Sequence, residues 1–278
     1  TEPELPGTSI NGARVMFIGN SFTYYGDCVL KGGALGSVDT GVFYKVAKSY
    51  GDNVRVINFT LGGAYLGASG SSDEKNLLLQ MVTMHPNYYN NSNGNAMDEF
   101  YNQDYVILQQ AGSNKSETYA ESLKIMSIFP PKTKFFFYMN TYTIDKNHTG
   151  VIQSAQQLRD RKGVTYIPVG ELIQGVWSGN VKIPGSTIKY DKYTFVVNQS
   201  SSDGYHPNKL TGYLTALFTY AAITGRSAVG ADYSFVSKDD KTYYTLGTTN
   251  FVSVLESPGD MLAFQNLIDQ YIAEYNPS

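Results

Sequence analysis

The chain of 278 residues is long enough for one large α/β domain or two small ones. Its 42% hydrophobic and 16% charged residues are typical of a globular protein with a substantial core. The formal net charge is -3 and no run of Lys and Arg occurs, which argues against nucleic acid as a partner, because phosphate binding needs clustered basic side chains. No apolar run approaches the roughly 18 residues that a membrane span requires.

Cysteine and histidine are scarce, which restricts the metal sites that the chain can build. The single cysteine, Cys28, excludes an intrachain disulfide and a thiolate-rich metal site. It reads most simply as a small buried residue, with a thiol nucleophile as the alternative. The three histidines are His85, His148 and His206, and no His-Glu-x-x-His pattern occurs. We therefore expect neither a metal nor another cofactor.

Short apolar runs recur along the chain, separated by segments with helical spacing of apolar residues. The runs 14–19, 54–59, 105–108, 134–138 and 164–168 predict five buried strands. The intervening and following segments predict helices over 40–50, 73–84, 117–128, 151–161, 206–225 and 259–275. This alternation predicts an α/β fold, a three-layer α/β/α sandwich whose central five-stranded sheet is parallel and covered by helices on both faces.

No internal repeat or linker divides the sequence, so we expect a single domain over residues 1–278. Residues 1–12 read as an extended N-terminal stub. Their acidic, Pro-containing start is typical of a chain after signal-peptide removal, with an artificial chain boundary as the alternative; the first reading predicts an exported protein (secreted, periplasmic or cell-surface). Residues 178–202 and 231–254 lack a helical period and predict irregular excursions, the first of them near the functional site. The oligomeric state is left open.

His206 differs from the other two histidines in its surroundings. It lies in Asp203-Gly204-Tyr205-His206-Pro207, where a carboxylate precedes the imidazole by three residues. Such a carboxylate can fix the ring tautomer and stabilise the imidazolium that forms when a histidine base takes a proton. The alternative is an aspartate that caps the following helix beside a passive histidine. His85 lies at a predicted helix end and His148 in a polar turn, and both read as structural.

Ser21 follows the first predicted strand directly, in the run Gly19-Asn20-Ser21-Phe22. The carboxyl ends of parallel strands meet at one edge of the sheet, where ligands bind, so Ser21 lies where a nucleophile would be placed. A helix cap is the structural alternative. The Gly-x-Ser-x-Gly elbow of α/β-hydrolases is absent. Ser21 as nucleophile, His206 as general base and Asp203 as the partner of His206 would form a catalytic triad.

These two runs resemble the first and last blocks of the SGNH hydrolases, the GDSL-type esterases and lipases. Gly-Asn-Ser-Phe is similar to the first block and Asp-x-x-His to the last. The run Asn58-Phe59-Thr60-Leu61-Gly62-Gly63 resembles the second block. The resemblance implies that the N–H of Gly63 belongs to the oxyanion hole, with Gly62 as the alternative. It extends in order from Arg14 to Gly225 and implies the flavodoxin-like SGNH hydrolase fold.

The third block departs from the family pattern. Gly-x-Asn-Asp is usual after the strand, whereas this chain has Gln109-Gln110-Ala111-Gly112-Ser113-Asn114. The segment Asp104-Tyr105-Val106-Ile107-Leu108-Gln109 resembles a less-studied bacterial branch of the family that has Leu-Gln at this place. Sialate and related carbohydrate acetylesterases also use a glutamine there. The resemblance therefore implies Gln109 as the side-chain donor of the oxyanion hole, with Gln110 second and Asn114 third. The backbone N–H groups of Ser21 and Gly63 would complete it.

Together these features predict a serine-dependent hydrolase of carboxylic esters that acts through an acyl-enzyme. A carbohydrate O-acetyl ester is the preferred substrate, because aromatic rings near the predicted site could stack on sugars; filling half-exposed positions is their alternative role. These rings are Tyr142, Tyr190, Tyr193 and Tyr205. Two other interpretations remain: a catalytically degraded carbohydrate-binding or surface protein, and a lipase or thioesterase of the same fold. The expected partner is a small-molecule or glycan ester.

Overall fold

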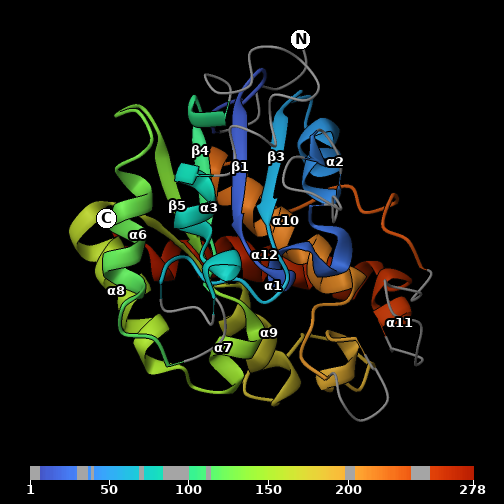
Figure 1. Cartoon of the computed structure of the whole chain (residues 1–278). Helices are drawn as coiled ribbons and strands as arrows, with labels where there is room; N and C mark the ends of the chain where they lie inside the picture. Colours follow the sequence, from blue (N-terminus) through green and yellow to red (C-terminus); the bar gives the residue numbers. More distant parts are fainter. Residues whose placement is uncertain are drawn as a thin grey trace.

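A single sheet organises the computed structural model, which describes residues 7–29, 37–38, 41–68, 72–83, 100–110, 114–197, 204–238 and 251–278. Its strand order is β2-β3-β1-β4-β5-β6. The strands are β1 (Arg14–Gly19), β2 (Ser37–Val38), β3 (Arg55–Thr60), β4 (Tyr105–Leu108), β5 (Lys134–Tyr138) and β6 (Thr165–Ile167). Five of them pair in parallel, and β2 adds a short antiparallel edge beside β3 (Figure 1).

The predicted five-stranded parallel sheet is confirmed. Without β2, its strands follow the order second, first, third, fourth, fifth along the chain, which is the flavodoxin-like arrangement. The order reverses at β1, which pairs with β3 on one side and β4 on the other. Such a reversal opens a crevice at the carboxyl ends of the central strands, and ligands of open α/β sheets bind there.

Helices cover both faces of the sheet (Figure 1). Val15 and Phe17 of β1 point into one core, which is closed by α2 (Val42–Ser49), α9 (Val169–Trp177), α10 (Lys209–Thr224), α11 (Phe251–Leu255) and α12 (Pro258–Tyr275). Met16 and Ile18 point into the other core, which is closed by α3 (Leu77–Thr83), α6 (Thr118–Met126) and α8 (Thr149–Lys162). Because both faces of β1 are buried, its sequence is continuously apolar rather than alternating. The three-layer sandwich is thus confirmed.

Several helices differ from the sequence-based expectations. The predicted helix 206–225 begins later, as α10 at Lys209, because Asn208 caps it and Pro207 forms a bridge with Val196 instead. Helices α1 (Ser21–Tyr24), α7 (Thr141–Asp145) and α9 lie where no element was predicted. Helix α11 occupies the end of the stretch 231–254 that was expected to be irregular, whereas 178–197 contains only the 3-10 turn η3 (Lys192–Thr194).

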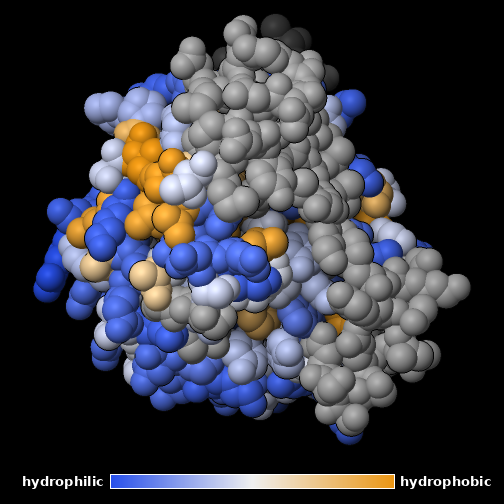
Figure 2. Space-filling model, viewed as in Figure 1, coloured by the Kyte–Doolittle hydropathy of each residue, from blue (hydrophilic) through white to orange (hydrophobic). Residues whose placement is uncertain are grey.

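The first described residues are anchored rather than extended away from the molecule. The Ser9 hydroxyl donates to Asp52 at 2.5 Å and the Ile10 N–H at 3.1 Å, and Ile10 is buried. Figure 2 shows a mostly hydrophilic described surface on this face, with hydrophobic atoms gathered toward the upper left. Among the described residues, no helix is both long enough and apolar enough to span a membrane.

Candidate active site

Ser21 is the first residue of the short helix α1 (Ser21–Tyr24), directly after β1. Asn20 caps this helix, because its Oδ1 accepts from the Phe22 N–H at 3.0 Å, and its Nδ2 donates to the Ala64 carbonyl at 3.1 Å. Gly19 leaves no room for a side chain: a Cβ there would lie 2.6 Å from Oε1 of Gln109. The Gly-Asn-Ser run therefore has a packing role for Gly, a capping role for Asn, and a hydroxyl at the rim of the sheet.

The structure brings Ser21 and His206 together across 185 positions of sequence. His206 Nε2 lies 2.8 Å from Ser21 Oγ, within hydrogen-bond distance, and both residues are half-buried. The His206 carbonyl accepts from the Val197 N–H at 2.8 Å. Two residues later, Asn208 Nδ2 donates to the Thr194 carbonyl at 2.8 Å. These bonds fix the backbone from which the imidazole projects.

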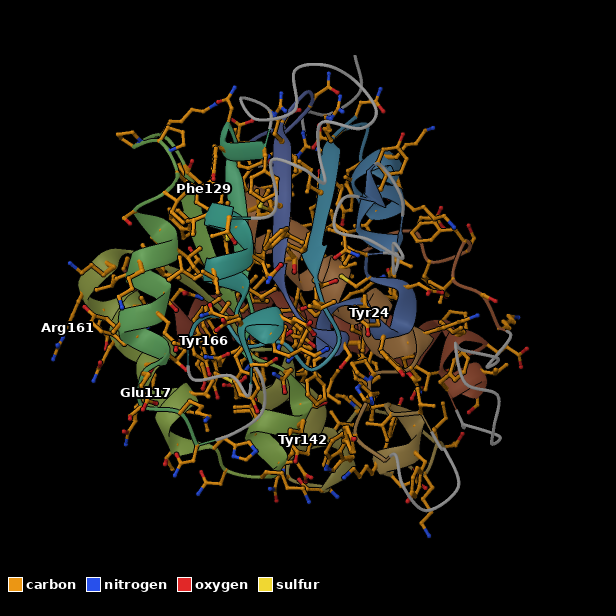
Figure 3. The ribbon with its side chains drawn as sticks, in the orientation of Figure 1. Tyr24, Glu117, Phe129, Tyr142, Arg161 and Tyr166 are labelled. Carbon is orange, nitrogen blue, oxygen red and sulfur yellow. The ribbon has the colours of Figure 1, made fainter. Side chains whose placement is uncertain are left out.

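Aromatic rings fix the orientation of the His206 side chain. The ring of Tyr25 stacks on the imidazole with centroids 4.0 Å apart and planes 20° from parallel. Phe22 stacks on it at 5.1 Å, and Tyr142 stacks in turn on Phe22 at 5.3 Å. In Figure 3, Tyr142 lies toward the lower end of the sheet, where β1 leads into α1. The imidazole is thus held by packing at the position where it meets the Ser21 hydroxyl.

The second predicted block lies at the end of β3, beside α1. Gly63 has φ +70, in the left-handed region that favours glycine, and it is exposed. Within the described part of the chain, its backbone N–H has no hydrogen-bond partner. The N–H of Ser21 begins a helix and therefore has no intrahelical acceptor either. At Gly62, the carbonyl accepts from Lys75 Nζ at 2.6 Å, which holds this turn in place.

Gln109 links the third block to the first. It is 1% exposed, and its Oε1 accepts from the Asn20 N–H at 2.9 Å and from the Thr23 hydroxyl at 2.8 Å. Because the backbone N–H can only donate, the oxygen of the amide must face it. The Nε2 group donates one hydrogen bond, to the Gln110 carbonyl. Gln109 therefore holds the Ser21 turn and retains one further N–H.

The two alternatives for Gln109 have other partners. Gln110 Nε2 donates to Thr118 at 3.0 Å and to Glu121 at 3.2 Å, so both of its amide hydrogens are used. Its Oε1 accepts from the Leu66 N–H at 3.0 Å. Asn114 is exposed, and its Oδ1 accepts from the Gly150 N–H at 2.7 Å at the start of α8. Of the two glutamines, only Gln109 thus keeps a side-chain N–H that no described residue accepts.

The remaining candidates from the sequence are Cys28, His148, Asp203 and His85, of which only the first two lie in the described part of the chain. Burial and the charge of Asp27 raise the pKa of the Cys28 thiol far above its usual range, which disfavours it as a nucleophile. His148 precedes α8, and burial and Lys146 lower its pKa. Asp203 and His85 lie outside the described residues. Within the described ranges, no group of three or more His, Cys, Asp and Glu side chains could hold a metal ion.

The four predicted tyrosines separate into two groups. Tyr205 packs on the His206 ring at 4.7 Å and on Tyr142 at 5.1 Å, so both lie at the candidate site. Tyr193 is 44% exposed and lies near Gly204. Tyr190 lies elsewhere: its hydroxyl donates to Asp260 at 2.5 Å and its ring stacks on Phe195. Tyr190 is therefore half-buried against the core and lines a separate hollow with residues 176–189.

Sequence reasoning missed three residues that shape the site. Tyr25, which stacks on His206, follows the Ser21 helix in a 3-10 turn, η1 (Tyr25–Asp27). Thr23 binds Gln109, and Asn140 at the end of β5 donates to the Gln110 carbonyl at 3.4 Å. Asn140 was detectable in principle, because it is a polar residue two positions after the end of a buried strand. Nothing in the sequence pattern pairs Tyr25 with a histidine so distant in the chain.

No protein-family model matches the sequence, and no curated protein matches it. Solved structures are similar to it. Axe2, an acetylxylan esterase from Geobacillus stearothermophilus, is 11% identical, covering 77% of this chain and 95% of that chain with a TM-score of 0.47. LAE5, an alpha/beta hydrolase enzyme from the metagenome of Lake Arreo, is 14% identical, covering 77% and 96% with a TM-score of 0.47. A putative GDSL-like lipase from Parabacteroides merdae is 14% identical, covering 77% and 95% with a TM-score of 0.44.

Proposed function

We propose that the protein is a serine-dependent hydrolase of carboxylic esters, with Ser21 as nucleophile and His206 as general base. The observation that carries this proposal is the 2.8 Å contact between Ser21 Oγ and His206 Nε2 at the carboxyl edge of the sheet. A serine hydroxyl is a weak nucleophile until a base accepts its proton, and this contact supplies that base. Asp203, three residues before His206, is the proposed partner of the second ring nitrogen.

The reaction follows from these positions. Ser21 Oγ attacks the ester carbonyl carbon while His206 Nε2 takes the hydroxyl proton. The tetrahedral intermediate collapses when the imidazolium returns that proton to the leaving alcohol, which gives an acyl-enzyme. A water molecule, deprotonated by His206, then attacks the acyl carbon, and the proton returns to Ser21 as the acid leaves. Each step uses the same nitrogen, so the stacking that holds the ring in place serves both halves of the cycle.

The proposed oxyanion hole consists of the backbone N–H groups of Ser21 and Gly63 and the remaining N–H of Gln109. The first two have no acceptor among the described residues, and Gln109 keeps one amide hydrogen after its bond to Gln110. Donors aimed at a developing oxyanion contribute roughly 3 kcal/mol each in comparable sites. The Oε1 of the same Gln109 amide accepts from Asn20 and Thr23, on either side of Ser21. One buried amide therefore positions both the nucleophile and a proposed oxyanion donor.

The proposed substrate is a carbohydrate O-acetyl ester. Tyr142 and Tyr205 lie beside His206, and the exposed ring of Tyr193 lies near Gly204. Aromatic rings of this kind present an apolar face and a polar edge, which suits the C–H and hydroxyl groups of a sugar. A lipase or thioesterase would instead favour long acyl chains. Hydrolysis of p-nitrophenyl esters with acyl chains of increasing length separates the two: the proposal predicts a maximum at acetate.

A fluorophosphonate probe tests the proposed nucleophile directly. The native protein should form one covalent adduct, located on Ser21 by peptide mass spectrometry, because the probe reacts only with an activated serine. His206→Gln should slow labelling strongly while leaving Ser21 in place, and heat-denatured protein should not react. Absence of a Ser21 adduct in folded protein would refute the proposal and favour a non-catalytic carbohydrate-binding protein.

A further inference from the structure

A cavity of about 420 Å³ lies next to the candidate site. It is lined by η1, one side of α2 from Val42 to Lys48, the start of α10 and the segment 235–237. Its wall includes Gly26, which directly follows the Tyr25 that stacks on His206, and Lys209, three residues after His206 itself. Its size is within the range of small-molecule sites. No step of the proposed ester hydrolysis uses it.

The wall that joins this cavity to the candidate site is rigid. Gly26 has φ +78 and packs so closely on α10 that a Cβ there would lie 2.2 Å from the Asn208 carbonyl oxygen. Asp27 is also left-handed, with φ 64, which is uncommon for a residue with a side chain. The cavity therefore keeps a fixed position relative to Tyr25, and through its ring relative to His206.

The cavity is lined by an excess of positive charge. Among the described residues that line it, Lys45, Lys48 and Lys209 contribute three ammonium groups, against the one carboxylate of Asp27. Within the described part of the chain, none of the three lysines forms a salt bridge; only Lys48 has a charge contact, over the Tyr44 ring at 5.8 Å. The whole chain carries a net charge of -3, so this concentration of cations is local.

One of the lysines also opposes the dipole of its helix. Lys209 is the first residue of α10, whereas Lys45 lies in the middle of α2 and Lys48 in its last turn. Neither helix has an acidic residue in its first turn, and no side chain caps the start of α2 at Gly41. Acidic groups normally stabilise this end of a helix, and cations there are unfavourable. A bound anion would relieve both the mutual repulsion of the three lysines and the conflict of Lys209 with the start of α10.

We propose that this cavity, the lysine cavity, binds an anionic sugar unit of the glycan whose ester is cleaved at Ser21, an inference that rests on the proposed function. The ammonium groups would hold its carboxylate or sulfate. Phe235 and Val236 form an apolar side that suits the C–H face of a sugar ring. The site thus selects acidic over neutral glycans without contacting the scissile ester.

Binding of sugars that carry no ester tests the lysine cavity independently of hydrolysis. Calorimetry with trigalacturonate, 6-O-sulfated galactotriose and neutral galactotriose compares carboxylate, sulfate and hydroxyl at one ring position. At about 0.01 M salt the protein should bind one acidic ligand at least about tenfold more tightly than galactotriose, with a preference that falls as salt is added. The tighter of the two acidic ligands identifies the anion. Equal binding of all three, or no binding of any, would overturn the proposal.

Charge removal provides the second arm. Lys45→Gln with Lys48→Gln should weaken acidic binding by about fivefold for each charge removed. Lys124→Gln, on an exposed position of α6 outside the cavity, is the matched control and should retain the wild-type preference. Unchanged acidic binding in the double variant would overturn the proposal. A kinetic assay uses acetylated forms of the same sugars. Relative to wild type, the double variant should have a lower ratio of kcat/KM for the acidic to the neutral substrate, and the change should lie in KM. If wild type hydrolyses neither substrate, that result counts against the proposed ester hydrolysis and not against the lysine cavity.

Discussion

Two adjacent buried glutamines allow the proposed oxyanion hole to be separated from the stability of the site. Gln109 is 1% exposed and Gln110 is 0% exposed; each side chain accepts a backbone N–H, and Gln109 donates one amide hydrogen and Gln110 two. Methionine has a similar length but neither donates nor accepts strongly. Gln109→Met and Gln110→Met therefore delete comparable sets of buried hydrogen bonds, and only the first deletes a proposed catalytic donor.

The expected losses follow from those bonds. Gln109→Met leaves the Asn20 N–H without its acceptor, and Gln110→Met does the same to the Leu66 N–H. A buried donor without a partner costs about 1–3 kcal/mol, so we expect both variants to lose a similar amount of unfolding free energy, about 2–4 kcal/mol with their other bonds. Loss of an oxyanion donor lowers kcat by about 100-fold to 1000-fold. Only Gln109→Met should show that loss.

Stability is measured by urea unfolding, and kcat with p-nitrophenyl acetate on protein shown to be folded by circular dichroism. Thr23→Val controls for displacement of the Ser21 turn, since it removes one hydrogen bond to the same Gln109 oxygen and leaves the amide N–H in place. We expect its kcat to fall by less than about tenfold. Equal loss of kcat in the two methionine variants would refute the assignment of Gln109 as the side-chain donor.

Three further predictions concern packing and protonation. Gly26→Ala should lose about 2–5 kcal/mol in urea unfolding from the left-handed φ and the contact with Asn208, whereas Gly163→Ala, with φ +68 and open space, should lose only the conformational part; equal losses would refute the close-packed wall. Burial raises the pKa of Glu171 from 4.5 to about 8, despite the opposing Tyr166 hydrogen bond. Folded protein then holds this proton more tightly than unfolded protein, so unfolding free energy should fall as pH rises from 4.5 to about 8. Glu171→Gln should flatten that fall, and a parallel decline in both proteins would contradict it. Native Cys28 should resist iodoacetamide at pH 8 and react only in urea; rapid modification of folded protein would contradict its burial.

The parallel sheet could be predicted because burial on both faces makes each strand a continuous apolar run. Strands β1, β4 and β5 have the predicted bounds, and β3 differs by one residue at each end. The edge strand β2 could not be predicted, since its two residues are too short for any pattern. Helix α9 begins one residue after the predicted strand 164–168 and was not predicted, because its nine residues include two glycines, Gly170 and Gly175, which weaken helical propensity.

The candidate site was predictable to the extent that chain order and strand ends determine it. Ser21 was selected because it is a serine that follows the first predicted strand. His206 was selected because it ends an Asp-x-x-His run at the start of a predicted helix. The choice between Gln109 and Gln110 did not follow, because neighbouring residues with the same side chain differ only in their partners across the sheet edge. Tyr25 and the lysine cavity depend on α10 packing against η1 and α2, which no local pattern specifies.

Hydrolysis of p-nitrophenyl acetate by wild type and by Ser21→Ala, measured side by side, tests the central claim most directly. Ser21 is half-buried at the rim of the sheet, and removal of its hydroxyl should leave the fold intact. We predict that wild type turns over the ester and that Ser21→Ala, with an unchanged circular dichroism spectrum, does not exceed the background rate. Retained turnover in folded Ser21→Ala protein would contradict the assignment of Ser21 as the nucleophile.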